Sequence, residues 1–135
     1  GKLKDLVTLH LSGNKLSELP NSIGELSSLI SLGLRNNNLK SLPDSIEKLT
    51  NLKSLDLDFN KLDNLPPEIV QLDELTVLSV QNNSLTSLPD SIGKLNKLTS
   101  LNLFNNKLTS LPPSIGELQN LTSLGLSKNN LRSFP

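Results

Sequence analysis

Apolar residues recur along the chain with a strict 23-residue period, as Leu6, Leu29 and Leu52 show. Each unit follows the pattern LxxLxLxxNxLxxLPxxIxxLxx. The alternation around the second and third leucines predicts a short β-strand that buries those leucines. The isoleucine and leucine three residues apart, as in Ile46 and Leu49, predict a single helical or 3₁₀ turn with one buried edge. A fixed period of this length indicates a stack of identical structural units.

The same pattern predicts how the units stack. A connection of about eighteen residues returns the chain to each next strand, so neighbouring strands run parallel, about 4.8 Å apart. The strands then form a sheet on one face, and the helical turns lie on the other. Because strands stack closer together than helical turns, the stack must curve. We expect an α/β solenoid, a curved right-handed coil with a parallel β-sheet on its concave face and short helical or 3₁₀ turns on its convex face.

Asparagine occupies one fixed place in every unit. The asparagine column consists of Asn14, Asn37, Asn60, Asn83, Asn106 and Asn129. A buried amide that lacks partners costs about 1–3 kcal/mol, whereas the asparagine side chain offers both donors and acceptors. We therefore expect this column to form a buried hydrogen-bonded ladder that holds the bend after each strand. A proline six positions further on, such as Pro43, ends strand-like pairing.

Composition narrows the possible partners. Thirteen basic and thirteen acidic residues balance along the chain without a visible Lys/Arg run, so neither nucleic acid nor an anionic membrane surface is an expected partner. No stretch of apolar residues is long enough for membrane insertion. The chain has no cysteine, which excludes disulfides and thiolate metal sites. This favours a cytoplasmic location, with a secreted or surface protein as the alternative.

These columns together resemble the leucine-rich repeat family, and the resemblance runs from Leu3 to Phe134. Among the leucine positions, Val80 and Phe134 depart from the pattern, and both changes are conservative. The LPxxIxxL subtype is similar to repeats of Ras-suppressor-like, Scribble-like, plant intracellular Ras-related, Roco and bacterial proteins. The resemblance implies protein recognition through the concave face. We expect residues 1–135 to form a single array of about five full repeats and a partial sixth, uncapped and part of a longer protein.

If the repeating columns are scaffold, partner recognition must come from the variable, solvent-facing positions of the strands. The candidates cluster in the middle of that face: Arg35, Asp56, Asp58, Phe59, Gln81, Asn102 and Phe104. An aromatic residue beside arginine and carboxylates is typical of a binding hot spot, and Phe104 is the strongest candidate.

Two acidic residues of this set are predicted to lie close to each other and to Arg35. Asp56 and Asp58 are expected to be solvent-exposed on one face, about 7 Å apart, with Arg35 close enough to reach Asp58. The structural alternative is that Phe59 shields the edge of the turn while Arg35 and Asp58 form a weak surface ion pair.

Catalysis is not expected. The single histidine, His10, lies about 10 Å from Asp56, too far for a hydrogen-bonded relay. Asp56 and Asp58 on one strand offer too few oxygen ligands for a metal, and no cofactor-binding motif is present. The leading prediction is a module that binds a folded protein. The alternatives are a docking segment of a larger signalling protein of the Roco type, or a structural or adhesive array of a microbial surface or effector protein. Self-association through uncapped ends is a further prediction.

Overall fold

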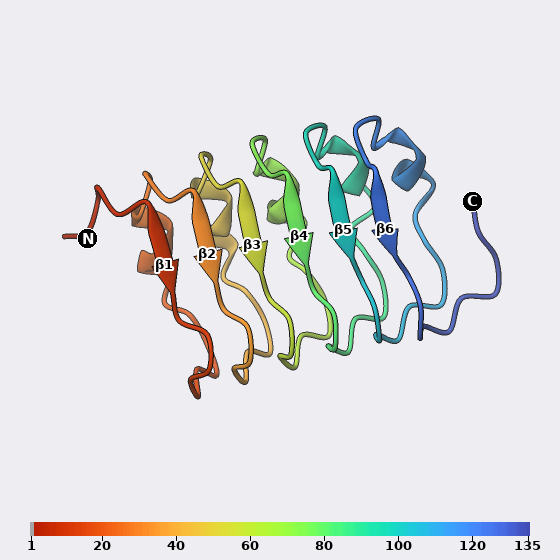
Figure 1. The fold of residues 1–135 in the computed structure, drawn as a ribbon, viewed down its shortest axis with the longest axis horizontal. Helices are drawn as coiled ribbons and strands as arrows, with labels where there is room; N and C mark the ends of the chain where they lie inside the picture. Colours follow the sequence, from red (N-terminus) through yellow and green to blue (C-terminus); the bar gives the residue numbers. More distant parts are fainter. Residues whose placement is uncertain (1) are drawn as a thin grey trace.

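The structure, a computed structural model, describes residues 2–135 and contains one parallel sheet of six short strands (Figure 1). The strands are β1 (Thr8–His10), β2 (Ser31–Gly33), β3 (Ser54–Asp56), β4 (Val77–Ser79), β5 (Ser100–Asn102) and β6 (Ser123–Gly125). They pair in sequence order, and Leu9 pairs with Leu32, which pairs with Leu55. This register confirms the 23-residue period.

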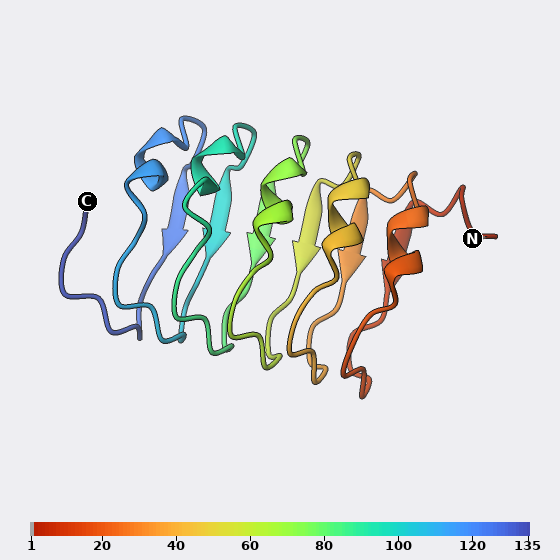
Figure 2. The same cartoon turned by 180° about the vertical axis from the view of Figure 1, so that it is seen from behind.

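Five 3₁₀ helices cover the opposite face of this part of the chain (Figure 2). They are η1 (Asn21–Glu25), η2 (Asp44–Lys48), η3 (Pro67–Gln71), η4 (Ile92–Lys94) and η5 (Pro113–Glu117). Pro43 directly precedes η2 in extended backbone, with φ −69° and ψ 150°, and so directs the chain into the helix. Within residues 2–135, no helix has the length and apolar character needed to cross a membrane.

The leucine and isoleucine columns form the core between the sheet and the 3₁₀ helices. In the inner units these side chains are completely buried, as Leu55 and Ile69 show. At the two ends of the stack some of these leucines are only partly buried, because an end unit has a neighbour on one side; they are Leu6, Leu9, Leu11, Leu16, Leu121, Leu124, Leu126 and Leu131. The open stack, with a sheet on one face and 3₁₀ helices on the other, confirms the expected solenoid.

The asparagine ladder is present and lies beneath the bend that follows each strand. The Asn60 Nδ2 donates to the carbonyl oxygens of Leu34 and Leu57, both at 3.0 Å, and its Oδ1 accepts from the Leu39 N–H at 3.0 Å. Asn60 therefore ties three backbone positions of two adjacent units together. Asn14 in the first unit is exposed and donates to the carbonyl oxygen of Leu11 in its own unit.

Candidate functional site

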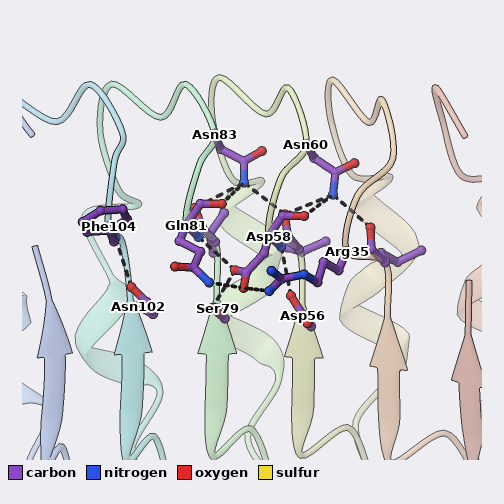
Figure 3. A network of polar contacts seen from close by, with 12 residues as sticks. Arg35, Asp56, Asp58, Asn60, Ser79, Gln81, Asn83, Asn102 and Phe104 are labelled. Carbon is purple, nitrogen blue, oxygen red and sulfur yellow. Dashed lines mark hydrogen bonds and ion pairs between the residues drawn. The ribbon is translucent and has the colours of Figure 1, made fainter. Parts of the chain in front are cut away.

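The candidate residues come together at the carboxyl ends of strands β2 to β5 (Figure 3). Asp56 is the last residue of β3, and Asn102 is the last residue of β5. Because adjacent strands are in register from one repeat to the next, the positions two residues after each strand end form one row across four units. That row consists of Arg35, Asp58, Gln81 and Phe104.

Asp58 is buried, with 3% of its surface exposed, so the expectation of a solvent-exposed carboxylate was wrong. Its Oδ1 accepts from the Ser79 hydroxyl at 2.6 Å and the Gln81 backbone N–H at 3.0 Å. Its Oδ2 accepts from the Gln81 Nε2 at 2.6 Å and the Arg35 Nη1 at 3.2 Å. The long side chains on either side cover the carboxylate. The Arg35–Asp58 contact exists as expected, but it belongs to a buried network that joins three units.

Arg35 also stacks on an aromatic ring. Its guanidinium carbon lies 4.7 Å from the centre of the Phe59 ring, within the range of a cation–π interaction. The Arg35 side chain is 47% exposed and Phe59 is 42% exposed. Arg35, Asn36 and Phe59 line a shallow hollow of about 210 Å³. The pair thus presents an aromatic surface and a fixed cation to solvent.

Phe59 holds this place in a backbone conformation that is unfavourable for a bulky residue. Its φ is 54°, and the corresponding position has a positive φ in all five of the other units. Elsewhere that column contains Gly13, Asn36, Asn82, Asn105 and Lys128. Glycine and asparagine adopt this left-handed region most readily, whereas an aromatic residue there is a steric outlier that costs about 1–2 kcal/mol. Strained residues of this kind cluster at ligand clamps and active sites.

Replacing Phe59 by asparagine is expected to change the free energy of unfolding by less than about 1 kcal/mol. Relief of left-handed strain, about 1–2 kcal/mol, offsets the loss of the cation–π contact, about 0.5–1 kcal/mol, and of the buried part of the ring, about 1 kcal/mol. Urea unfolding followed by circular dichroism measures the change. Phe104→Asn is the matched control, since Phe104 is half-buried and lies outside the positive-φ column, so the same replacement should lower stability. A clear loss of stability in Phe59→Asn would contradict the strain argument.

Asp56 lies beside this network in a different electrostatic environment. Its Oδ1 accepts from the Asp58 backbone N–H at 3.0 Å. Burial, as the main cause, raises the pKa of the Asp56 carboxyl from its ordinary value of 3.8, and the nearby Asp58 charge adds to this, while the bond from the Asp58 N–H opposes it. Two units along, the uncharged Asn102 occupies the same place. Its Oδ1 accepts from the Phe104 N–H at 3.1 Å, as the Asp56 Oδ1 accepts from the Asp58 N–H.

Asp56→Asn is therefore expected to stabilise the chain at neutral pH. The raised folded-state pKa means that the wild type loses stability as pH rises from the unfolded pKa through the folded one. Asparagine keeps the acceptor for the Asp58 N–H, as Asn102 does, and removes this loss. Unfolding midpoints measured from pH 3 to pH 8 should show a gain above that window that disappears below 3.8. A gain of equal size at every pH would contradict this account.

The structure adds residues that the sequence pattern had not singled out. Ser79 donates to Asp58, and Asn36 lines the hollow beside Phe59. The Lys128 Nζ lies 5.4 Å from the centre of the Phe104 ring, which forms a second cation–aromatic pair. Phe104 is half-buried, so Phe59 is the more exposed of these two rings. Ser79 stands one repeat after Asp56, and Asn36 is next to Arg35 in the sequence. Lys128 occupies the same column as Phe59, three repeats later.

The remaining hollows and polar groups suggest no chemistry of their own. His10 and Asp56 are separated by a full strand, with Gly33 paired between them. No three His, Cys, Asp or Glu side chains among residues 2–135 come together as a metal site. A hollow of about 560 Å³ lies at the other edge of the sheet, and its charged residues, Lys53, Asp73 and Glu74, have both signs. The patch formed by Arg35, Asp58, Phe59 and Gln81 is therefore the most organised surface feature among the described residues.

Comparison with known proteins places this geometry in a family. A model of the leucine-rich repeat region matches residues 29–105, and a leucine-rich repeat model matches residues 5–26 and 97–118. No curated protein matches the chain. Among solved structures, a leucine-rich repeat protein of Leptospira interrogans is similar with a TM-score of 0.65 and 36% identity over 98% of this chain.

A second solved structure is closer in shape. It is the leucine-rich repeat ectodomain of the plant membrane receptor kinase GASSHO1/SCHENGEN3 from Arabidopsis thaliana, in complex with CASPARIAN STRIP INTEGRITY FACTOR 2. The TM-score is 0.84, with 40% identity over 93% of this chain. The chain spans 45% of the Leptospira protein and 16% of the plant ectodomain. The matching family model covers more than half of the sequence, and the chain belongs to the leucine-rich repeat family.

Proposed function

We propose that the chain is a protein-interaction module that binds a folded partner through its sheet face. Leucine-rich repeat domains generally mediate protein–protein interaction and are typically not enzymes. One similar structure is an ectodomain in complex with CASPARIAN STRIP INTEGRITY FACTOR 2. The observation that carries the proposal is Phe59, a strained aromatic residue that is 42% exposed beneath a fixed arginine.

The repeating columns and the variable positions of the sheet face have different tasks. The leucine and asparagine columns are almost uniform, because they pack the core and hold the bends. At the position of Phe59, packing imposes no aromatic, since asparagine occupies the same place in three other units. A strained residue that remains exposed is best explained by a contact with another molecule.

Photo-crosslinking in cells that express the protein tests which face binds. A photoreactive phenylalanine derivative replaces Val77, which is exposed on β4, or Gln71, which is exposed at the end of η3 on the opposite face. Neither side chain belongs to the polar network. We expect one discrete protein to be crosslinked from position 77 and not from position 71. Equal crosslinking from both faces, or crosslinking from position 71 alone, would contradict the proposal.

A second candidate function keeps the same face within a larger signalling protein. The plant ectodomain, of which this chain spans 16%, belongs to a membrane receptor kinase. In that setting the sheet face would dock a ligand or a regulatory partner. A kinase or nucleotide-binding sequence in the same gene would favour this candidate, and a gene that encodes repeats alone would exclude it.

A further inference from the structure

Charge is divided unevenly between the segments that follow the strands and the rest of the chain, although the total is balanced. Residues 12–19 and their counterparts in each later repeat follow the strands and contain seven cationic and three acidic side chains. The rest of the chain contains six cationic and ten acidic side chains. Lys15, Lys61 and Lys107 are exposed in the first set of segments, on alternate units. We call the edge of the sheet where the strands end the turn edge; it is net positive.

The hollow beside Phe59 lies on the turn edge and suits a carboxylate. Arg35 carries five N–H donors and donates one bond, from Nη1 to Asp58. The stack on Phe59 and the bond to Asp58 hold the guanidinium in place, so little side-chain entropy is lost when a ligand binds. A partner carboxylate can pair with the remaining donors while its methylene groups lie against the Phe59 ring.

A second cation–aromatic pair lies further along the same edge. Phe104 pairs with Lys128, whereas Phe59 pairs with Arg35. The two rings are two units apart, and each cation lies one unit beyond its ring. Arg35 and Lys128 are therefore four units apart, or about 19 Å at 4.8 Å per strand. An extended chain covers that distance in about six residues. Between the pairs the surface is polar, with Gln81 and Asn102 in the centre; Asp58 is buried there, and Asp56 on β3 is the one partly exposed carboxylate.

The geometry points to an acidic partner segment that crosses strands β2 to β6 and places one carboxylate at Arg35 and another, about six residues away, at Lys128. This inference rests on the proposed function and names the chemistry of the partner at that surface. An apolar segment would bury the Arg35 guanidinium without pairing its free donors, which is unfavourable. A basic segment would be repelled by the net positive edge.

Three blocked, fluorescein-labelled peptides of about eight residues test this, all with Ser and Gly as spacers. The first carries two Glu about six residues apart, the second carries Gln in both places, and the third carries two adjacent Glu. By fluorescence anisotropy at low ionic strength, we expect the first to bind the intact chain at least about tenfold more tightly than the second. It should also bind more tightly than the third, and added salt should weaken it.

Variants locate the contact. Arg35→Gln should remove most of the preference for glutamate. A charge reversal is avoided, because a second carboxylate beside buried Asp58 would destabilise the chain. Lys97→Gln is the matched control: it removes the same charge from an exposed residue that pairs with Glu74 outside the turn edge. Circular dichroism verifies that both variants are folded, and the control should bind like the wild type.

Three results would overturn the inference: no binding of any peptide, equal binding of the Glu and Gln peptides, or equal effects of Arg35→Gln and Lys97→Gln. None of these results would contradict the proposed function, because that proposal is tested separately by crosslinking from position 77. A partner crosslinked there while the peptides fail would show that the sheet face binds a partner of different chemistry.

Discussion

Replacing Asn60 by alanine is expected to lower the free energy of unfolding by about 3–4 kcal/mol, a large part of the stability of a chain of this size. The side chain is 8% exposed, and its amide serves the carbonyl oxygens of Leu34 and Leu57 and the N–H of Leu39. Alanine leaves the Leu39 N–H without a partner, which costs about 1–3 kcal/mol, and removes one bond from each carbonyl oxygen, which costs about 1 kcal/mol each. The two oxygens keep their bonds from Asn37 and Asn83. Urea unfolding followed by circular dichroism measures the loss.

Asn14→Ala provides the matched control for Asn60→Ala. Asn14 occupies the same column, but it is exposed and bonds to Leu11 within its own unit. Water can satisfy the groups that the alanine leaves, so the expected loss is below about 1 kcal/mol. Similar losses in the two variants would contradict the assignment of the column as a buried ladder whose members act by linking adjacent units.

Asp58→Asn is expected to lower the free energy of unfolding by about 2–4 kcal/mol with almost no change in side-chain volume. Both carboxylate oxygens accept bonds, one from Ser79 and Gln81, the other from Gln81 and Arg35. An asparagine NH₂ group must replace one of the oxygens and then faces donors. The charge that pairs with Arg35 is lost as well.

Asp63→Asn separates this effect from a general change of charge. Asp63 is exposed in the same unit, so its replacement should change stability by less than about 0.5 kcal/mol. If Asp58→Asn were as mild as Asp63→Asn, the carboxylate would not be the centre of a buried network, and the three units would be joined by backbone contacts alone.

The sequence predicted the scaffold well because each scaffold column has one physical task. The leucines form the repeated core, and Asn60 and its equivalents bond backbone groups at fixed sequence offsets. The period and the residue type were therefore sufficient to predict both. Self-similarity then specifies the register, because every strand pairs with the strand one repeat away.

The burial of Asp58 could not be predicted from the alternation within one unit. By alternation it should face solvent, yet it is buried because the side chains of Arg35 and Gln81, one unit away on either side, close over it. Its burial depends on which residues flank it across the sheet, and the pattern of a single unit does not contain that information. Reading the column across units, as Arg35-Asp58-Gln81, would have indicated the contact.

Phe59 was named as a candidate, but its strained backbone and the charge distribution were missed for related reasons. The backbone at Phe59 has a positive φ, and the signal was an aromatic in a column otherwise made of Gly, Asn and Lys. The positive edge is not visible in the linear sequence, because its cations are spread through five separate segments and the total charge is balanced. The fold gathers them on one side.

The affinity of Phe59→Asn for the partner crosslinked from Val77 tests the central claim most directly. The claim is that this chain keeps a strained aromatic residue because its sheet face recognises another protein. Since this variant should be about as stable as the wild type, weaker binding cannot be ascribed to unfolding. Calorimetry is expected to show a Kd at least about tenfold higher, whereas Gln71→Asn on the opposite face binds normally. An unchanged Kd for Phe59→Asn would contradict the account.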